Sequence, residues 1–326
     1  MYSKKIGFII AALVAAQWCC GIVQAQEGWP SGKPIRLVVG FAPGGPADLV
    51  ARVLAKQLSG QLQSPVLVEN HAGANANIAA NLVAKSAPDG YTFLFNTSSL
   101  AISPALYRNL PFDPAKDLIP VASAAVLPLV LVVEASSPVN TFKEWVAYLK
   151  ANPAKYNYGS PGAGNLAHLG MVMLLQANGL EATHVPYKGS SEALAALLGK
   201  NTQFQLDSVN SVLALIRAGR VKPIAVVSLN RAPILPEVPT VSESGMPEFE
   251  LTAWQGVMAP AKTPIAIVER FNAEIAKAMD QPEMKTTLAA QGAVFIARSP
   301  GQYANYFQSE VQRYQKVVKV VGLTQE

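Results

Sequence analysis

Cysteine is almost absent from this chain of 326 residues, which carries only Cys19 and Cys20. Both lie within the first 25 residues, so the chain has no cysteine from Gln26 onward. This absence excludes disulfides, thiolate nucleophiles and cysteine-bound metals from that part of the chain. Its stability must come from an apolar core, and a chain of this length with 50% hydrophobic residues can build one or two.

Histidine and clustered charge are scarce as well. The three histidines, His71, His168 and His184, do not pair with another ligand type at the spacing of a metal site, so we expect no metal and no cofactor. The formal net charge is +5, and no run of Lys or Arg occurs. A nucleic-acid partner is therefore not expected.

The amino-terminal residues 1–25 predict a secretory signal peptide. Lys4 and Lys5 form a positive region, an apolar stretch follows from Ile6 to Trp18, and Val23-Gln24-Ala25 is a small-residue cleavage site. A transmembrane helix needs about 20 apolar residues and is the less favoured alternative. We expect cleavage after Ala25 and a periplasmic location.

Two glycine-rich loops are the most informative features that are present. Phe41–Asp48 follows an apolar run and opens a helical pattern. Gly159–Asn165 lies between Lys155-Tyr156-Asn157-Tyr158 and another helical pattern. A strand that passes through glycines into a helix start leaves backbone N–H groups free and directs the positive end of the helix dipole outward. Each loop is therefore a candidate seat for an anion.

Strand and helix patterns alternate along the chain and predict an α/β fold with parallel sheets. Strands are expected at 35–41, 65–69, 91–96, 126–134, 156–158, 183–187, 204–207 and 224–228. Helices are expected at 49–62, 78–83, 142–149, 166–174, 193–198, 267–279 and 307–321, and the proline-rich stretch 231–264 is expected to be irregular.

This order of elements predicts two domains connected by two crossovers near Leu131 and Ser228. Domain 1 is expected to comprise residues 26–130 and 229–326, and domain 2 residues 131–228. Ligands of open α/β sheets bind outside the carboxyl ends of the strands, which is where both glycine loops lie. The cleft is expected where the two loops meet.

Five ordered motifs resemble one family, the Bug-type (tripartite tricarboxylate transporter) solute-binding proteins. They are Gly44-Gly45-Pro46-Ala47-Asp48, Pro88-Asp89-Gly90-Tyr91-Thr92, His184-Val185-Pro186-Tyr187-Lys188-Gly189, the run from Pro236 to Gly245, and Trp254-Gln255-Gly256-Val257-Met258-Ala259-Pro260. The resemblance implies a two-lobed fold of the type II periplasmic binding proteins. It also implies that backbone groups and ordered waters of the two loops hold a carboxylate.

One stretch departs from the family pattern. The family usually has a Pro-Gly-Ala-Gly-Gly-Asn run after the second strand, whereas this chain has Ala72-Gly73-Ala74-Asn75-Ala76-Asn77. Three positions differ, and two of them, Asn75 and Ala76, replace glycines of the family run, so the local path of the backbone is expected to differ from that of the family.

The candidate ligand-binding residues come from both loops and from the ends of neighbouring strands. They are Phe41, Ala42, Gly44, Gly45, Asp48, Ser98, Ser160, Ala163, Gly164, Asn165, His168, Tyr187, Asp207 and Trp254.

Several of these side chains have a structural interpretation beside the functional one. Asp48 is better explained as a group that caps the following helix and complements its dipole. It could instead accept a ligand ammonium or hold loop amides. His168 either makes hydrogen bonds at the helix surface or contacts the ligand or braces its loop. Trp254 either lines the cleft or packs at the crossover, and His184 is best explained as a packed strand residue. Asp207 is the preferred direct contact to the solute, and Tyr187 with Lys188 offers a phenol and a cation.

The chain matches the sequence patterns of a dinucleotide site, a P-loop and a hydrolase nucleophile elbow only poorly. Gly162–Ala167 fits the dinucleotide fingerprint G-x-G-x-x-A, but the match is short. The glycines of residues 40–45 have P-loop spacing, yet Pro46 and Ala47 stand where Lys and Ser/Thr are required. Tyr158 stands two residues before Ser160, where the nucleophile-elbow pattern G-x-S-x-G requires glycine. No catalytic residue is therefore expected.

The sequence thus predicts a receptor that closes by a hinge over a small carboxylate-bearing solute. The expected partners are inner-membrane permease subunits or the ectodomain of a sensor kinase, and a monomer is expected. The alternative from another class is a secreted α/β enzyme that acts on carboxylated substrates. The identity of the carboxylate stays open.

Overall fold

The computed structural model describes residues 28–153, 155–187 and 189–323. Residues up to Ser31 form a unit of their own, so the account below concerns the second unit, which begins at Gly32. The predicted signal peptide and Lys188 lie outside the described residues. Among the described helices, none is both long and apolar enough to cross a membrane.

Nine strands of the described chain form one mixed sheet. Its order is β2-β1-β3-β9-β4-β7-β5-β6, and β8 pairs with β4. The strands are β1 (Ile35–Val39), β2 (Val66–Asn70), β3 (Thr92–Thr97), β4 (Leu118–Glu134), β5 (Asn157–Ser160), β6 (Thr183–Pro186), β7 (Phe204–Ser208), β8 (Val221–Val226) and β9 (Thr252–Pro260).

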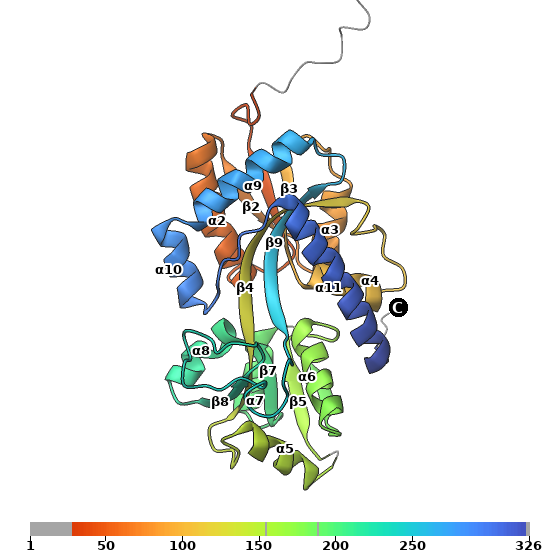
Figure 1. The fold of residues 1–326 in the computed structure, drawn as a ribbon, viewed down its shortest axis with the longest axis vertical. Coiled ribbons are helices and arrows are strands. Elements are labelled where there is room, and N and C mark those ends of the chain that lie inside the picture. The colour runs from red at the N-terminus through yellow and green to blue at the C-terminus, as the bar shows by residue number, and fades with distance from the viewer. Residues whose placement is uncertain (1–27, 154, 188, 324–326) are drawn as a thin grey trace, which may run out of the picture. The chain divides into compact units, whose positions relative to one another are not determined.

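Two long antiparallel strands, β4 and β9, connect two parallel sets. β1 pairs in parallel with β2 and β3, and β5 pairs in parallel with β6 and β7. β4 pairs with β9 from Leu118 to Pro128 and with β7 and β8 from Leu129 to Glu134. The two strands run side by side between the two groups of helices (Figure 1).

Ten α-helices of the described chain cover the sheet. They are α2 (Pro46–Leu62), α3 (Asn77–Ala84), α4 (Ser99–Leu106), α5 (Phe142–Lys150), α6 (Leu166–Ala177), α7 (Ser190–Leu198), α8 (Val209–Arg217), α9 (Ile265–Met279), α10 (Pro282–Ala290) and α11 (Pro300–Val321). Side-chain caps stabilise the first turns of several of these helices. Ser299 and Gln302 form a capping box at the start of α11, and the Thr141 side chain accepts the amide of Glu144 in α5.

Two hydrophobic clusters hold the helices on the sheet. The larger includes Leu94, Leu131, Trp145 and Trp254 and runs along both parallel sets. The smaller joins Val130 and Val132 of β4 to buried residues of α7 and α8 and to Leu235 and Val238. Leu235 and Val238, which follow β8, therefore pack on the end of the sheet that α7 and α8 cover. The division into domains at 130/131 and 228/229 stays a prediction.

The expected α/β fold is confirmed, and both parallel sets lie where the strand patterns predicted them. Two expectations are wrong. The stretch 231–264 is not irregular throughout, because β9 occupies Thr252–Pro260, and β4 begins eight residues before the expected 126. Both strands carry prolines and small residues, which weaken a strand signal, but seven of the nine β9 residues are buried between neighbouring strands. Helices α4, α8 and α10 were also not predicted.

The segment that departs from the family pattern adopts an unusual backbone. Ala74, Asn75 and Ala76 have φ values of 46°, 54° and 72°, in the left-handed region that glycine tolerates best. Ala76 lies against the first glycine loop, since a Cβ added to Gly40 would lie 2.2 Å from the Ala76 Cβ. Ala74 and Ala76 thus store backbone strain, and Ala76 does so beside Gly40, the residue before the first glycine loop.

The substitution Ala74→Gly should stabilise the protein. Ala74 is exposed, so glycine removes strain without removing a buried contact. After the entropy that glycine adds to the unfolded chain, we expect a gain of about 0.5–1 kcal/mol. Ala72→Gly is the matched control, because Ala72 is exposed and lies outside the left-handed region, and it should destabilise by a similar amount. Equal effects of both substitutions in urea unfolding would contradict the strain.

Candidate functional site

The strand register brings the ends of β3 and β7, which neighbour the strands before the two glycine loops, to the same stretch of β4. In the sheet, Thr97 at the end of β3 pairs with Gln255, which pairs with Ala125. At the end of β7, Ser208 pairs with Leu129 of β4. From residue 125 to residue 129 a strand advances about 13 Å at 3.3 Å per residue.

The strand directions make these ends face each other. β3 and β1 run in the same direction as β4, because β9 is antiparallel to both β3 and β4. β7 and β5 run in the opposite direction. The carboxyl ends of the two parallel sets, and the loops that follow β1 and β5, therefore point toward each other along β4. We call the segment Phe41–Asp48 loop A and the segment Gly159–Asn165 loop B.

Loop A is held by the carboxylate of Asp48, which is only 2% exposed. Its Oδ2 accepts the backbone N–H of Gly44 at 2.9 Å and the Nε–H of Arg52 at 2.8 Å. Its Oδ1 accepts from the Asn70 amide at 2.9 Å, and the same amide nitrogen donates to the carbonyl of Phe41. Asp48 and Asn70 thus hold both sides of the glycine turn.

The charge of Asp48 is neutralised within the protein. Burial raises the pKa of this carboxyl, but the hydrogen bonds from Arg52, Gly44 and Asn70 outweigh burial, and its pKa lies below the ordinary value. The guanidinium of Arg52 is in turn shared between Asp48 and Asn70. This arrangement agrees with the structural interpretation of Asp48; a contact with a solute stays a prediction.

Loop B is held by the same kind of bond to a different side chain. The backbone N–H of Gly164 donates to Nδ1 of His168 at 2.9 Å. Asn165 caps α6 by accepting the amide of His168 at 3.0 Å. In both loops, the glycine that precedes the helix therefore donates its amide to the side chain four residues later.

Two stacked imidazoles lie beneath loop B. The ring centroids of His168 and His184 are 3.7 Å apart, and the planes are inclined by 9°. Nε2 of His184 lies 2.7 Å from Oγ of Ser160, which also exchanges hydrogen bonds with the N–H and C=O of Gly162. Burial lowers the pKa of His168 to about 4, helped by the charge of His184, and burial alone lowers that of His184 to about 4. Both rings are neutral near pH 7.

Asp207 connects the starts of two further helices. Its Oδ1 accepts from the Ser190 hydroxyl at 2.9 Å and from the Ser208 amide at 2.7 Å, at the beginnings of α7 and α8. Its Oδ2 accepts the Gln205 side-chain amide at 2.6 Å. Burial raises the pKa of Asp207 above its ordinary value, although these hydrogen bonds oppose the shift. Both oxygens are engaged, and direct contact with a solute stays a prediction.

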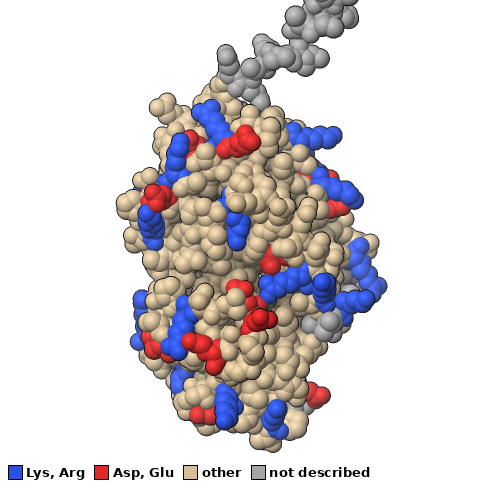
Figure 2. Space-filling view, in the orientation of Figure 1, with Lys and Arg blue, Asp and Glu red and all other residues tan. Residues whose placement is uncertain are grey.

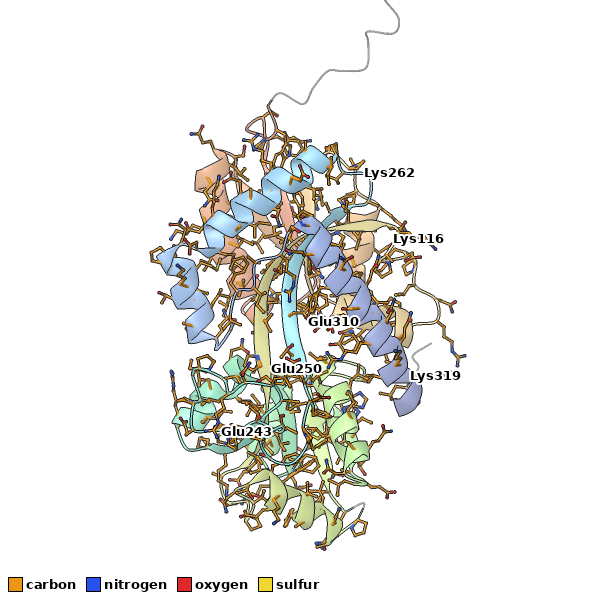
Figure 3. The ribbon with its side chains drawn as sticks, viewed as in Figure 1. Lys116, Glu243, Glu250, Lys262, Glu310 and Lys319 are labelled. Carbon is orange, nitrogen blue, oxygen red and sulfur yellow. The ribbon has the colours of Figure 1, made fainter. Side chains whose placement is uncertain are left out.

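Trp254 packs against α11. Its indole Nε1 donates to Oε2 of Glu310 at 2.9 Å, and it meets three α11 rings at steep angles (Tyr303, Tyr306 and Phe307). The side chain is only 1% exposed. Figure 3 shows Glu310 on α11 above Glu250, whose carbonyl accepts from Arg313. This agrees with the packing interpretation of Trp254, without testing whether it also reaches a solute.

The remaining predicted site residues follow the strand ends. Ser98 is buried after β3 and donates its amide to the carbonyl of Trp254 at 3.0 Å. Tyr187 is half-buried after β6 and donates its amide to Ser160. In the loops, Ala42, Gly44 and Ala163 are exposed, whereas Phe41 and Gly45 are half-buried.

Four partners of the predicted site residues were not themselves predicted from the sequence: Arg52, Asn70, Ser190 and Gln205. Arg52 stands four residues after Asp48 on the same helix, and Gln205 stands two residues before Asp207 on the same strand, so spacing could have indicated both contacts. Asn70 and Ser190 come from other elements, so only the fold brings them to Asp48 and Asp207. The Ser160–His184 pair was missed for the same reason.

Although it joins a hydroxyl to an imidazole, the Ser160–His184 pair does not resemble an activated nucleophile. Ser160 is 1% exposed, and its hydroxyl is engaged within loop B. The His184 ring stacks on His168 and also packs against Tyr158. Among the described residues, no group of three or more His, Cys, Asp or Glu could hold a metal ion.

Charge and cavities elsewhere do not mark a competing site. Figure 2 shows Lys and Arg interspersed with Asp and Glu over the face in view. A cavity of about 210 Å³ lies between α9 and the start of α11, and Ser123, Asn272 and Arg298 line it with seven other residues. None of the residues of loop A or loop B belongs to this lining.

The mixed sheet crossed by two long strands is the fold of the periplasmic binding proteins. The family described as the tripartite tricarboxylate transporter family receptor matches residues 50–323. Protein BugT of Bordetella pertussis is 36% identical over 324 residues, which cover 99% of each chain. The chain belongs to this receptor family, so the resemblance of its five motifs is confirmed.

Two solved structures support the same conclusion. An R. palustris protein determined with adipate is 33% identical and has a TM-score of 0.85 over 91% of this chain and 100% of that one. MatC from Rhodopseudomonas palustris, with bound malate, is 32% identical and has a TM-score of 0.80 over 88% of this chain and 99% of that one. These relatives are solute-binding receptors rather than enzymes.

The brace of loop A should be essential to stability. Asp48→Ala leaves the Gly44 and Asn70 donors and the Arg52 charge without their acceptor, and we expect a loss of about 2–4 kcal/mol in the free energy of unfolding. Glu283→Ala is the control, because it removes an exposed carboxylate that pairs with Lys56, and it should cost no more than about 1 kcal/mol. Similar losses in urea unfolding would contradict the bracing role of Asp48.

Proposed function

We propose that this protein captures a small carboxylate-bearing solute between loop A and loop B and closes over it by a hinge. The observation that carries the proposal is that the carboxyl ends of the two parallel sets face each other, with the ends of β3 and β7 at residues 125–129 of β4. The adipate and malate bound to the two related structures are carboxylates, which supports this class of solute.

The groups offered to the solute are backbone amides rather than side-chain cations. The amides of Gly44 and Gly164 are already bonded to Asp48 and His168, so they shape the loops instead of binding. The amides of Ala47 and Asp48 in the first turn of α2 have no acceptor within the helix. Gly45 begins α2 without a side-chain cap, so this helix end is open to an oxyanion, directly or through water.

The wider biological role follows from the family. A receptor of a tripartite tricarboxylate transporter delivers its solute to permease subunits of the inner membrane, and a sensor-kinase ectodomain is the second candidate partner. We propose that the protein acts in the periplasm as a monomer after cleavage behind Ala25. The hinge is proposed near Leu131 and Ser228, where the crossovers were predicted.

A thermal-shift screen against a carboxylate library that includes adipate and malate tests the proposal. At 100 times its dissociation constant a ligand stabilises the folded state by about 2.7 kcal/mol, which should raise the melting temperature by several degrees. A turnover assay on the same compounds tests the enzyme alternative. The proposal fails if no carboxylate raises the melting temperature, or if a compound is converted instead of being held.

The glycine loops should govern affinity through their backbone conformation. Gly44 and Gly164 have φ values of 82° and 75°, so Gly44→Val and Gly164→Val should weaken solute binding by tenfold or more, about 1.4 kcal/mol. Ser160→Ala removes one neutral hydrogen-bonding group and should cost about 0.5–1.5 kcal/mol. Calorimetry with a solute from the screen measures these effects on the folded variants.

Gly219→Val provides the matched control for backbone strain. Gly219 has a φ of 65° with open space around its Cα, and it lies in the turn after α8. This variant should lose stability like the loop variants but bind with unchanged affinity. If the loop variants bind normally while Lys188→Ala abolishes binding, the carboxylate rests on a side-chain cation and the proposed site is wrong.

A further inference from the structure

The two loops are held by matching bonds to chemically different acceptors. In each loop, a glycine amide donates to the side chain four residues later, at 2.9 Å in both cases. The acceptor is the carboxylate of Asp48 in loop A and the imidazole nitrogen of His168 in loop B. A carboxylate oxygen keeps its lone pairs down to low pH, whereas an imidazole Nδ1 can accept only while it carries no proton.

We propose that His168 is a positioning residue for solute capture, whose neutral Nδ1 holds loop B in its binding conformation until acid protonates the ring. The inference rests on the proposed function, because it concerns the affinity of the same loops. It predicts that loop B loses its shape on acidification while loop A keeps its own. The protein would then release its solute from one side.

The hydrogen-bond geometry determines the state of the ring. Because the Gly164 N–H is a donor, Nδ1 of His168 must be the acceptor, and the ring proton lies on Nε2. A proton on Nδ1 would set two donors against each other. The amide of Gly164 would lose its partner, and loop B would lose one of its side-chain bonds to α6 while the cap from Asn165 stays.

The neighbouring ring reinforces this requirement. His184 lies in parallel contact with His168 at 3.7 Å, so two imidazolium charges would repel each other strongly there. His184 also lies 2.7 Å from the Ser160 hydroxyl, which connects it to the other end of loop B. The stacked pair therefore supports the loop at both ends and favours neutral rings.

The charges around the pair do not favour protonation. Tyr158 of β5 stacks on His184 and is tilted toward His168. The other elements packed on α6 include β7, α11 and the segment before β9, where Leu251 lies against Gly170 and Met246 accepts from Asn178. In that segment Glu248 is exposed, and the carbonyl of Glu250 accepts from Arg313. The charged and titratable groups of β7 and α11 are engaged or directed elsewhere. Asp207 of β7 bonds to Ser190, Ser208 and Gln205. On α11, Glu310 bonds to Trp254 and Arg313, Tyr303 bonds to Asn96, and Tyr306 lies beneath Arg298. Tyr314 is buried, and Lys316 and Lys319 are exposed.

The sign of the pH dependence follows from these contacts. The pKa of His168 is lowered from 6.5 to about 4 by burial and by His184, so the unfolded chain binds more protons than the folded protein between these values. Stability that is present above pH 6.5 is therefore lost as pH falls toward 4. The unfolding equilibrium constant should rise by up to tenfold per pH unit for this one histidine.

The first test uses the wild-type protein without a solute. Side-chain nitrogen NMR should find His168 protonated on Nε2 and neutral at pH 5, with a scalar coupling between the Gly164 amide nitrogen and Nδ1. A ring protonated on Nδ1 at neutral pH, or one that titrates near 6.5, would overturn the inference. This readout does not depend on whether any carboxylate binds.

The second test uses the substitution His168→Asn, whose Oδ1 can accept the Gly164 amide but cannot titrate. Between pH 6.5 and 4 the pH slope of its unfolding free energy should be smaller than that of the wild type by up to one proton. His71→Asn, which removes a half-buried histidine outside the loops, should leave the slope of His168 in place. Equal slopes in the wild type and His168→Asn would contradict the role of His168.

Solute binding separates this inference from the proposed function. With a carboxylate from the screen, the ratio of wild-type to His168→Asn dissociation constants should rise about twofold from its own value at pH 7 when the pH reaches 4, and further below it. Protonation of the solute affects both proteins equally and cancels in the ratio. A ratio that stays constant would overturn the positioning role while the receptor function stands.

Discussion

The antiparallel pairing of β4 with β9 is the constraint on which the rest of the structure depends. Because β9 lies between β3 and β4, the first parallel set runs in the direction of β4. Because β7 pairs antiparallel with the far half of β4, the second set runs against it. Two ordinary parallel sets thereby direct their carboxyl ends, and their glycine loops, at the same stretch of β4. A single parallel sheet would have placed both loops along one edge.

The loops themselves depend on buried polar contacts rather than on glycine alone. Glycine permits the positive φ values of Gly44 and Gly164, but the side chains of Asp48 and His168 select the conformation. In the proposed function, the amides of Ala47 and Asp48 in the first turn of α2 bind the anion, and neither loop contains a cationic side chain.

The sequence predicted the parts of this arrangement that depend on local pattern. Both loops, the parallel strands beside them and the family followed from apolar runs, glycines and five motifs. Strand β9 escaped because its glycine and small residues give little strand signal, although the sheet buries most of it. Asn70 and Ser190 were not predicted as partners of Asp48 and Asp207 because they reach them only through the fold. The departure from the family pattern pointed to Asn75 and Ala76 but gave no signal for the left-handed backbone of Ala74.

The central proposal for this protein is that loop A and loop B hold one carboxylate at the same time. Mapping the backbone amide signals of the isotopically labelled protein, during titration with a carboxylate from the screen, tests this claim most directly. The account predicts that the amides of residues 42–48 and 160–165 shift together, in the same proportion and with one dissociation constant. Shifts confined to one loop, or gathered around Arg298 and the cavity beside α9, would contradict it.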